Sequence, residues 1–189
     1  MSAEWMNTFF AGATFVVIAA TAIAALIQLR HLRSGNQIVT LLSVADRRST
    51  PEFRAAINYV FQGELDRKLQ DPEYRKGLMR VPVDQVAHPE MWLLNSWEQN
   101  GAMLKLGWFS EMAFMETAGL QCIAAWQKLS PVVAIIRRIR GPQVFDNFEY
   151  IASRAIMWEA RHARGTFPKD TPHLPATDPF PEDTTAHMT

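Results

Sequence analysis

The chain has 189 residues, with 19 basic and 19 acidic side chains and a single cysteine. One cysteine excludes an internal disulfide and any metal site built from several cysteines. When an apolar N-terminal segment and a polar C-terminal segment are set aside, about 130 residues remain, which is enough for one modest domain with its own core.

The apolar segment at residues 9–29 lies inside a run of 25 residues, 5–29, that contains no ionisable side chain. As a helix, residues 9–29 would be roughly 31 Å long, which matches a bilayer hydrocarbon core of roughly 30 Å. A cleaved signal peptide usually begins with basic residues, whereas only Glu4 carries charge ahead of this run. A core helix that is apolar on every face would need protein on all sides. We therefore predict a transmembrane helix, preceded by a short external N-terminus at residues 1–8.

Basic residues flank only the C-terminal end of this segment, where Arg30, His31 and Arg33 follow directly. The positive-inside rule then places the N-terminus outside and the rest of the chain in the cytoplasm, in a single-pass inner (plasma) membrane protein. Arg30 and Arg33 are candidates for contact with anionic lipid headgroups. Small residues recur at multiples of four along one face of the span, which fits either lipid-facing alanine or close approach of a second copy.

Helical spacing continues after the span, so residues 30–48 are predicted to form a juxtamembrane helix. A new helix then begins with Ser49 or Thr50 as its cap, Pro51 at the first helical position and Glu52 in the first turn. It opens a cytoplasmic helical domain predicted at residues 49–164.

Later helices are predicted where glycine or proline separates segments of helical periodicity. No segment alternates with the period of a strand, so the fold class is all-α. The segment after Gly165 is rich in proline, threonine and acids and has few apolar residues, so residues 165–189 are predicted to form a disordered tail. The later helices are expected at residues 89–106, 110–118, 120–129, 131–140 and 143–164.

Two similar segments, LLNSWEQNG and FDNFEYIA, place an asparagine and a glutamate beside aromatic side chains. A carboxylate beside an apolar helix face must be paired, because its charged form is otherwise costly to bury. Glu98 and Glu149 could form an acid/base pair or a cation site. We favour a structural centre in which ion pairs fix the helix register. The residues predicted for this polar centre are Asn95, Glu98, Asn147, Glu149, Arg138 and Arg154.

No familiar catalytic or cofactor motif occurs, so the catalytic residues are unknown and no cofactor is expected. The histidines lack the Glu-x-x-His spacing of di-iron bundles and the His-Glu-x-x-His spacing of zinc proteases, so no metal site is predicted. Phosphate-binding glycine-rich loops and the Gly-x-Ser-x-Gly motif are also missing. Cys122 lies in an apolar helix and is interpreted as a packed thiol.

The segment PVVAIIRRIRG combines apolar side chains with Arg137, Arg138 and Arg140. Such a basic amphipathic helix is a candidate for contact with anionic lipid. Alternatively, these arginines pair with the glutamates of the polar centre. The segment is short, and no nucleic-acid partner is expected.

The apolar span ending in QLRHLR, followed by HPEMWLLNSWEQNGAMLKLGWFS and GPQVFDNFEYIA, resembles the small membrane-anchored bacterial proteins catalogued as domain of unknown function forty-seven-sixty. The resemblance covers residues 9–164. In that family the first motif is more often an aromatic residue followed by two glutamates and Ile-Gly, whereas this chain has Gln99 and Asn100. The resemblance implies an architecture and no activity.

Three functions are compatible with these features. The leading hypothesis is a membrane-anchored scaffold or regulatory module that binds a protein partner or a second copy of itself. The alternatives are a membrane-bound enzyme that uses Glu98 and Glu149, and a sensor of anionic lipid surfaces.

Overall fold

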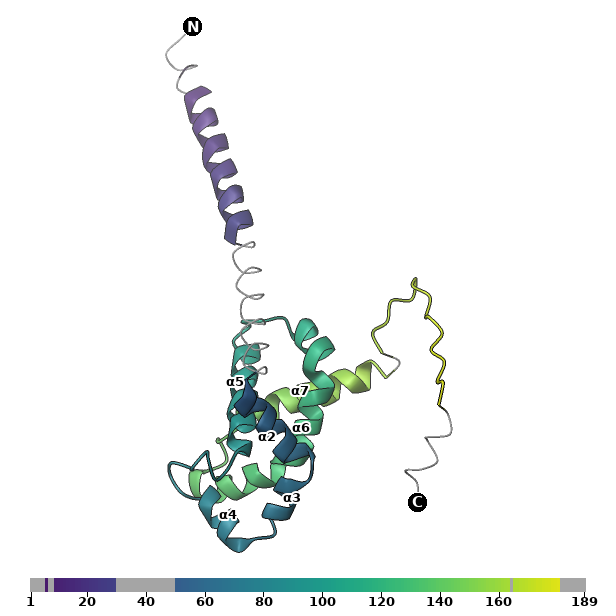
Figure 1. The fold of residues 1–189 in the computed structure, drawn as a ribbon. Helices are drawn as coiled ribbons and strands as arrows, with labels where there is room; N and C mark the ends of the chain where they lie inside the picture. The colour runs from purple at the N-terminus through teal and green to yellow at the C-terminus, as the bar shows by residue number, and fades with distance from the viewer. Residues whose placement is uncertain (1–5, 7–8, 30–49, 164, 181–189) are drawn as a thin grey trace.

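A computed structural model describes residue 6 and residues 9–29, 50–163 and 165–180. Within these ranges every regular element is a helix (Figure 1), which confirms the predicted all-α class. The predicted juxtamembrane helix at residues 30–48 lies outside the described residues, as do most of the predicted external N-terminus and the last part of the tail, from residue 181 onward.

The apolar N-terminal helix, Phe9–Leu29, is drawn purple in Figure 1. Nearly all of its side chains are exposed. Its two threonines donate their hydroxyls to carbonyls one turn earlier, Thr14 to Phe10 and Thr21 to Val17, both at 2.8 Å. The helix therefore satisfies its own hydroxyl groups while it presents an apolar surface on every side.

The domain begins with three short helices, α2 (Pro51–Phe61), α3 (Glu64–Lys68) and α4 (Pro72–Leu78). Helix α2 starts as predicted, because the Thr50 hydroxyl accepts a hydrogen bond from the Phe53 backbone N–H at 3.3 Å. Helix α4 is capped in the same way by Asp71.

Three longer helices, α5 (Glu90–Lys105), α6 (Glu111–Arg140) and α7 (Asp146–Arg161), form most of the core. Helices α5 and α6 both pack on α7, and α2 packs on α5. Phe148 of α7 lies at the centre, fully buried, with its ring stacked on Trp97 at 6.0 Å and edge-on to Trp126 at 5.0 Å between centroids. Aromatic pairs in these geometries add stabilisation beyond the area that they bury.

Helix α6 is continuous through Gly119 and Pro131, so the predicted helix ends at these two residues were wrong. Proline removes one backbone hydrogen bond, but Pro131 lies on the exposed face, where the freed carbonyl can reach water. Leu129 and Val132 are fully buried on either side of it. Tertiary packing thus overrides the local breaking signal. After α7, residues 165–180 contain no helix, and their side chains are exposed.

Candidate functional site

Glu98, one of the predicted polar residues, caps the N-terminus of α7 from a neighbouring helix. Helix α7 has Phe145 as its N-cap residue, at φ 60°, and no side chain of its own caps it. The Glu98 carboxylate of α5 accepts hydrogen bonds from the Phe148 backbone N–H at 2.9 Å and from Asn147 Nδ2 at 2.8 Å. A carboxylate at this position satisfies an unpaired N–H and interacts favourably with the helix dipole.

Gly101, one turn after Glu98, allows this contact. A Cβ atom on Gly101 would lie 2.0 Å from the Asn147 carbonyl oxygen, so no larger residue fits without moving α7. The Trp97-Glu98-x-x-Gly101 pattern is therefore a helix-docking motif: the tryptophan packs on Phe148, the glutamate caps α7, and the glycine admits its backbone.

The structure does not bring the six residues predicted for the polar centre into one cluster. Only Glu98 and Asn147 contact each other. Glu149, half-exposed, pairs with Arg137 at 2.7 Å, and Arg154 makes a two-pronged ion pair with Glu111. The side chains of Asn95 and Arg138 are exposed.

The residues predicted to contact lipid lie in different places. Arg137 donates to the Val144 carbonyl in addition to its pair with Glu149, and Arg140 donates to the Arg80 carbonyl at 2.7 Å. Arg138 is exposed on the last turns of α6. Arg30 and Arg33 lie outside the described residues.

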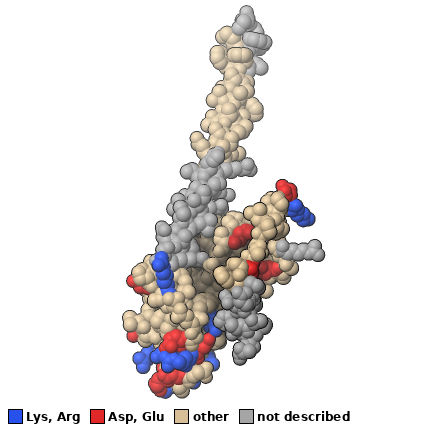
Figure 2. Space-filling view, turned by 45° about the vertical axis from the view of Figure 1, so that its right-hand side comes forward, with Lys and Arg blue, Asp and Glu red and all other residues tan. Residues whose placement is uncertain are grey.

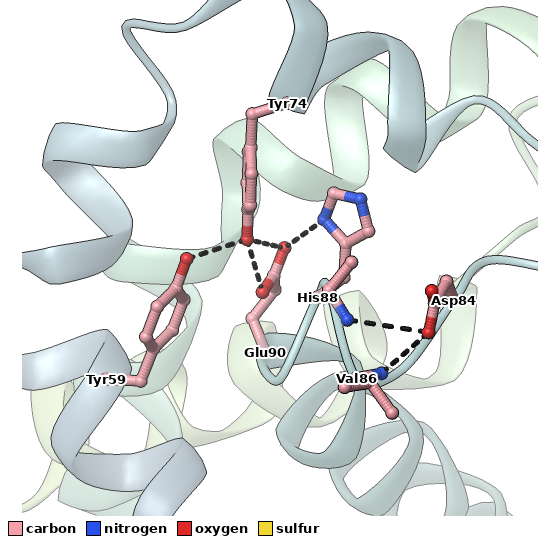
Figure 3. Close-up of polar contacts among 7 residues, drawn as sticks. Tyr59, Tyr74, Asp84, Val86, His88 and Glu90 are labelled. Atoms are coloured by element: carbon pink, nitrogen blue, oxygen red, sulfur yellow. Dashed lines mark hydrogen bonds and ion pairs between the residues drawn. The ribbon is translucent and has the colours of Figure 1, made fainter.

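The most buried polar cluster in the described part of the chain consists of Tyr59, Tyr74, His88 and Glu90 (Figure 3). Glu90 has no exposed surface and His88 is 3% exposed. The Tyr74 hydroxyl lies 2.8 Å from both carboxylate oxygens of Glu90 and accepts a hydrogen bond from the Tyr59 hydroxyl at 2.9 Å. His88 Nδ1 lies 3.3 Å from Glu90 Oε1. The four residues link α2, α4 and the start of α5.

Local backbone features place His88 in this cluster. The Asp84 carboxylate accepts from the Val86 N–H at 2.9 Å and the Asp84 carbonyl accepts from the His88 N–H at 3.0 Å, which closes the turn before α5. The imidazole lies against Gly77 of α4, where an added Cβ atom would come within 2.4 Å of Nε2. Its ring also packs on Tyr74 at 4.4 Å between centroids.

Burial raises the pKa of the Glu90 carboxyl, and the hydrogen bond from Tyr74 opposes that rise only in part. Burial also raises the pKa of Tyr74, and the hydrogen bond with Tyr59 adds to the effect. Burial raises the pKa of Tyr59 as well, so the environment favours the uncharged forms of Glu90 and of both tyrosines. We call the four residues the clamp, because their contacts join α2, α4 and the start of α5.

Sequence reasoning missed this cluster because its members are far apart along the chain and Glu90 has the appearance of an ordinary first-turn acid. The signal that could have found the cluster is the segment His88-Pro89-Glu90, which places a histidine and a glutamate at a helix start, directly before an apolar helix face.

A separate pocket of about 380 Å³ lies between the first half of α6 and the end of α7. Trp158 and His162 stack on each other at 4.1 Å between centroids on one of its walls. Within the described ranges no group of three histidine, cysteine or acidic side chains is placed to hold a metal ion. The remaining lining is mixed: Met115, Glu116, Thr117, Ala118, Gly119, Leu120, Gln121, Glu159, Gly165 and Thr166.

Together these features define a small all-helical domain, built on a docked α5–α7 pair and a buried tyrosine–glutamate–histidine clamp, that follows an apolar N-terminal helix. The chain belongs to the family described as a domain of unknown function (DUF4760), whose model matches residues 15–155. This match confirms the family suggested by the sequence motifs, and it includes both the Trp97-Glu98-x-x-Gly101 motif and the clamp. No curated protein and no solved structure matches the chain significantly.

Proposed function

We propose that this protein is a single-pass, membrane-anchored helical module that acts by binding a protein partner or a second copy of itself. The observation that carries the proposal is the helix Phe9–Leu29. No residue in the most apolar stretch of this helix is buried. Leaving 21 such residues in water would be costly, whereas a bilayer removes their apolar surface from water along the whole length of the helix.

Helix α6 is also long and apolar enough to cross a membrane, but in this proposal it is a core helix of the domain. Of the residues in its most apolar stretch, 44% are buried inside the domain, where α6 packs on α5 and α7. Its exposed face carries the polar side chains Glu116, Gln121 and Arg138 as well as the apolar side chains Met112, Leu120 and Ile139. Charged side chains on the solvent side of a half-buried helix favour a domain that stands in water over a second span.

The basic residues after the span support an orientation with the N-terminus outside and the domain in the cytoplasm. Arg30 and Arg33 follow the helix directly, whereas residues 1–8 contain no lysine or arginine. Short basic flanks of this kind remain on the cytoplasmic side.

Binding is favoured over catalysis by the way in which the candidate acids are used. Glu98 is engaged at the N-terminus of α7, Glu149 is paired with Arg137, and Glu90 is enclosed by side chains of its own cluster. These carboxylates hold helices together, which is what a rigid interaction module requires.

The experiment is crosslinking in membranes, followed by purification of the full chain and mass spectrometry. We expect either a crosslinked dimer or one partner enriched above a matched control, in which the same anchor carries an unrelated soluble domain. Recovery of the monomer alone would contradict the binding proposal. Release of the chain by alkaline carbonate would contradict the anchor.

A further inference from the structure

The turn between α5 and α6 exposes three large apolar side chains within seven residues. Leu106 is 65% exposed, Trp108 is 53% exposed, and Met112, in the first turn of α6, is 63% exposed. We call these three residues the apolar turn. Water-exposed apolar side chains are ordinary when scattered, but a group of three that includes a tryptophan marks an interaction surface.

The apolar turn is held firmly by its neighbours. Phe109, in the middle of it, is buried and stacks on Phe114 with 5.3 Å between ring centroids. The Gly107 and Trp108 N–H groups donate to carbonyls of the last turn of α5. Because Phe109 fixes the turn from inside, the other apolar side chains cannot fold inward and are displayed outward.

Figure 1 shows the turn between α5 and α6 at one end of the domain and α3 and α4 at the other. The opposite end is highly charged: Figure 2 shows lysine, arginine, aspartate and glutamate side chains gathered there. Three ion pairs contribute to that end: Glu64–Arg67 within α3, Glu73–Lys76 within α4, and Asp66–Lys128 between α3 and α6. The apolar turn and the charged surface thus lie at opposite ends of the domain.

We propose that the apolar turn rests in the interfacial layer of the same bilayer that holds the N-terminal helix, so that the domain is docked on the membrane in one orientation. The inference rests on the proposed anchor, because the anchor decides which surface the turn meets. Tryptophan is the side chain best suited to the headgroup region of a bilayer.

The charges beside the turn are compatible with a lipid surface. Lys105 donates to Asn147 at 2.8 Å and lies 3.9 Å from the Asp146 carboxylate, and Glu111 is neutralised by its two-pronged pair with Arg154. No uncompensated carboxylate of the α6 start therefore repels anionic headgroups.

The test uses the full chain in nanodiscs of phosphatidylcholine with a minor share of phosphatidylglycerol. Spin labels are placed at Leu106→Cys and, separately, at Met112→Cys, in a Cys122→Ala background. The matched control is Glu73→Cys, whose side chain is 75% exposed at the charged end. Collision rates with oxygen, which concentrates in lipid, and with a water-soluble nickel chelate are compared at each site.

We expect oxygen collisions to dominate at positions 106 and 112 and nickel collisions to dominate at position 73. Nickel access at 106 and 112 equal to that at 73, in protein that stays in the nanodisc, would overturn the docking and leave the anchor intact. Strong spin–spin coupling between copies at 112 would also overturn it, because a second copy would then cover the turn. Loss of the protein from the nanodisc would overturn both the docking and the proposed anchor.

Discussion

Replacement of Gly101 by alanine tests whether the close contact between α5 and α7 organises the domain. The new Cβ atom would lie 2.0 Å from the Asn147 carbonyl oxygen, a backbone atom that cannot rotate aside. The two helices must separate by more than an ångström to reach ordinary van der Waals distance. Such a shift breaks the 2.9 Å hydrogen bond from the Phe148 N–H to Glu98.

The size of the effect follows from these contacts. Overpacking costs about 1–3 kcal/mol, and loss of a hydrogen bond to a charged group costs about 1.5–3 kcal/mol. Alanine returns up to about 1 kcal/mol through its better helix propensity. Gly101→Ala should therefore lower the free energy of unfolding by about 2–5 kcal/mol, equivalent to a fall in Tm of about 8 °C or more for a domain of this size.

Gly119→Ala is the matched control, since it also changes a buried glycine inside a long helix. Its Cβ atom would meet only Met115 and Glu159 side-chain atoms, at 3.7 Å and beyond, so we expect an unchanged or slightly higher Tm. Both variants can be melted as full-length protein in detergent and followed by far-ultraviolet circular dichroism. Equal Tm values for the two variants would refute the docking role of Gly101.

Three further predictions concern the clamp, the ion pairs and the C-terminal segment. Because the pKa of Glu90 is raised in the folded state above its ordinary 4.5, its contribution to stability is complete below about pH 4.5 and is lost as pH rises through the folded pKa. The Glu90→Gln variant should lack this loss. If denaturant titrations give parallel pH profiles of the free energy of unfolding for wild type and variant, they contradict the clamp. Glu98→Ala should lower the free energy of unfolding by about 2–3 kcal/mol, because it removes two hydrogen bonds at a helix terminus. Glu149→Ala should lower it by about 1 kcal/mol or less, because the ion pair with Arg137 is half-exposed. A larger loss for Glu149→Ala than for Glu98→Ala in the same titrations would contradict this ranking. Truncation after Gly165 should shift Tm by less than about 3 °C, since the described part of the removed segment, residues 166–180, is exposed and contacts the domain through a surface hydrogen bond from Thr166 to Glu116. A larger fall in Tm would show that the segment packs on the domain.

Local signals in the sequence were sufficient for the helix class and for several helix ends. The Thr50-Pro51 start of α2 was predictable because a cap and a proline act within one turn. Pro131 was wrongly predicted to separate two helices, because the effect of a proline depends on which face of α6 is exposed, and distant residues decide which face that is. The Tyr59–Tyr74–Glu90–His88 clamp was missed for the same reason, since three separate elements must fold together before it exists.

The candidate site shows a similar division. The sequence singled out Glu98 and Asn147 as two of six residues of a predicted polar centre, because a carboxylate next to an apolar stripe needs a partner, and the structure joins these two by a hydrogen bond. An arginine was the expected partner, but the structure supplies the backbone N–H of Phe148. Free N–H groups occur at every helix start and carry no side-chain signature, so a cap supplied by another helix cannot be read from residue types.

The intact mass of the protein retained in carbonate-washed membranes tests the central claim most directly. A retained N-terminal helix predicts that the membrane fraction holds the full 21.4 kDa chain. A shorter species that lacks residues 1–29 and is found in the soluble fraction would contradict the claim, because the apolar helix would then be a cleaved signal.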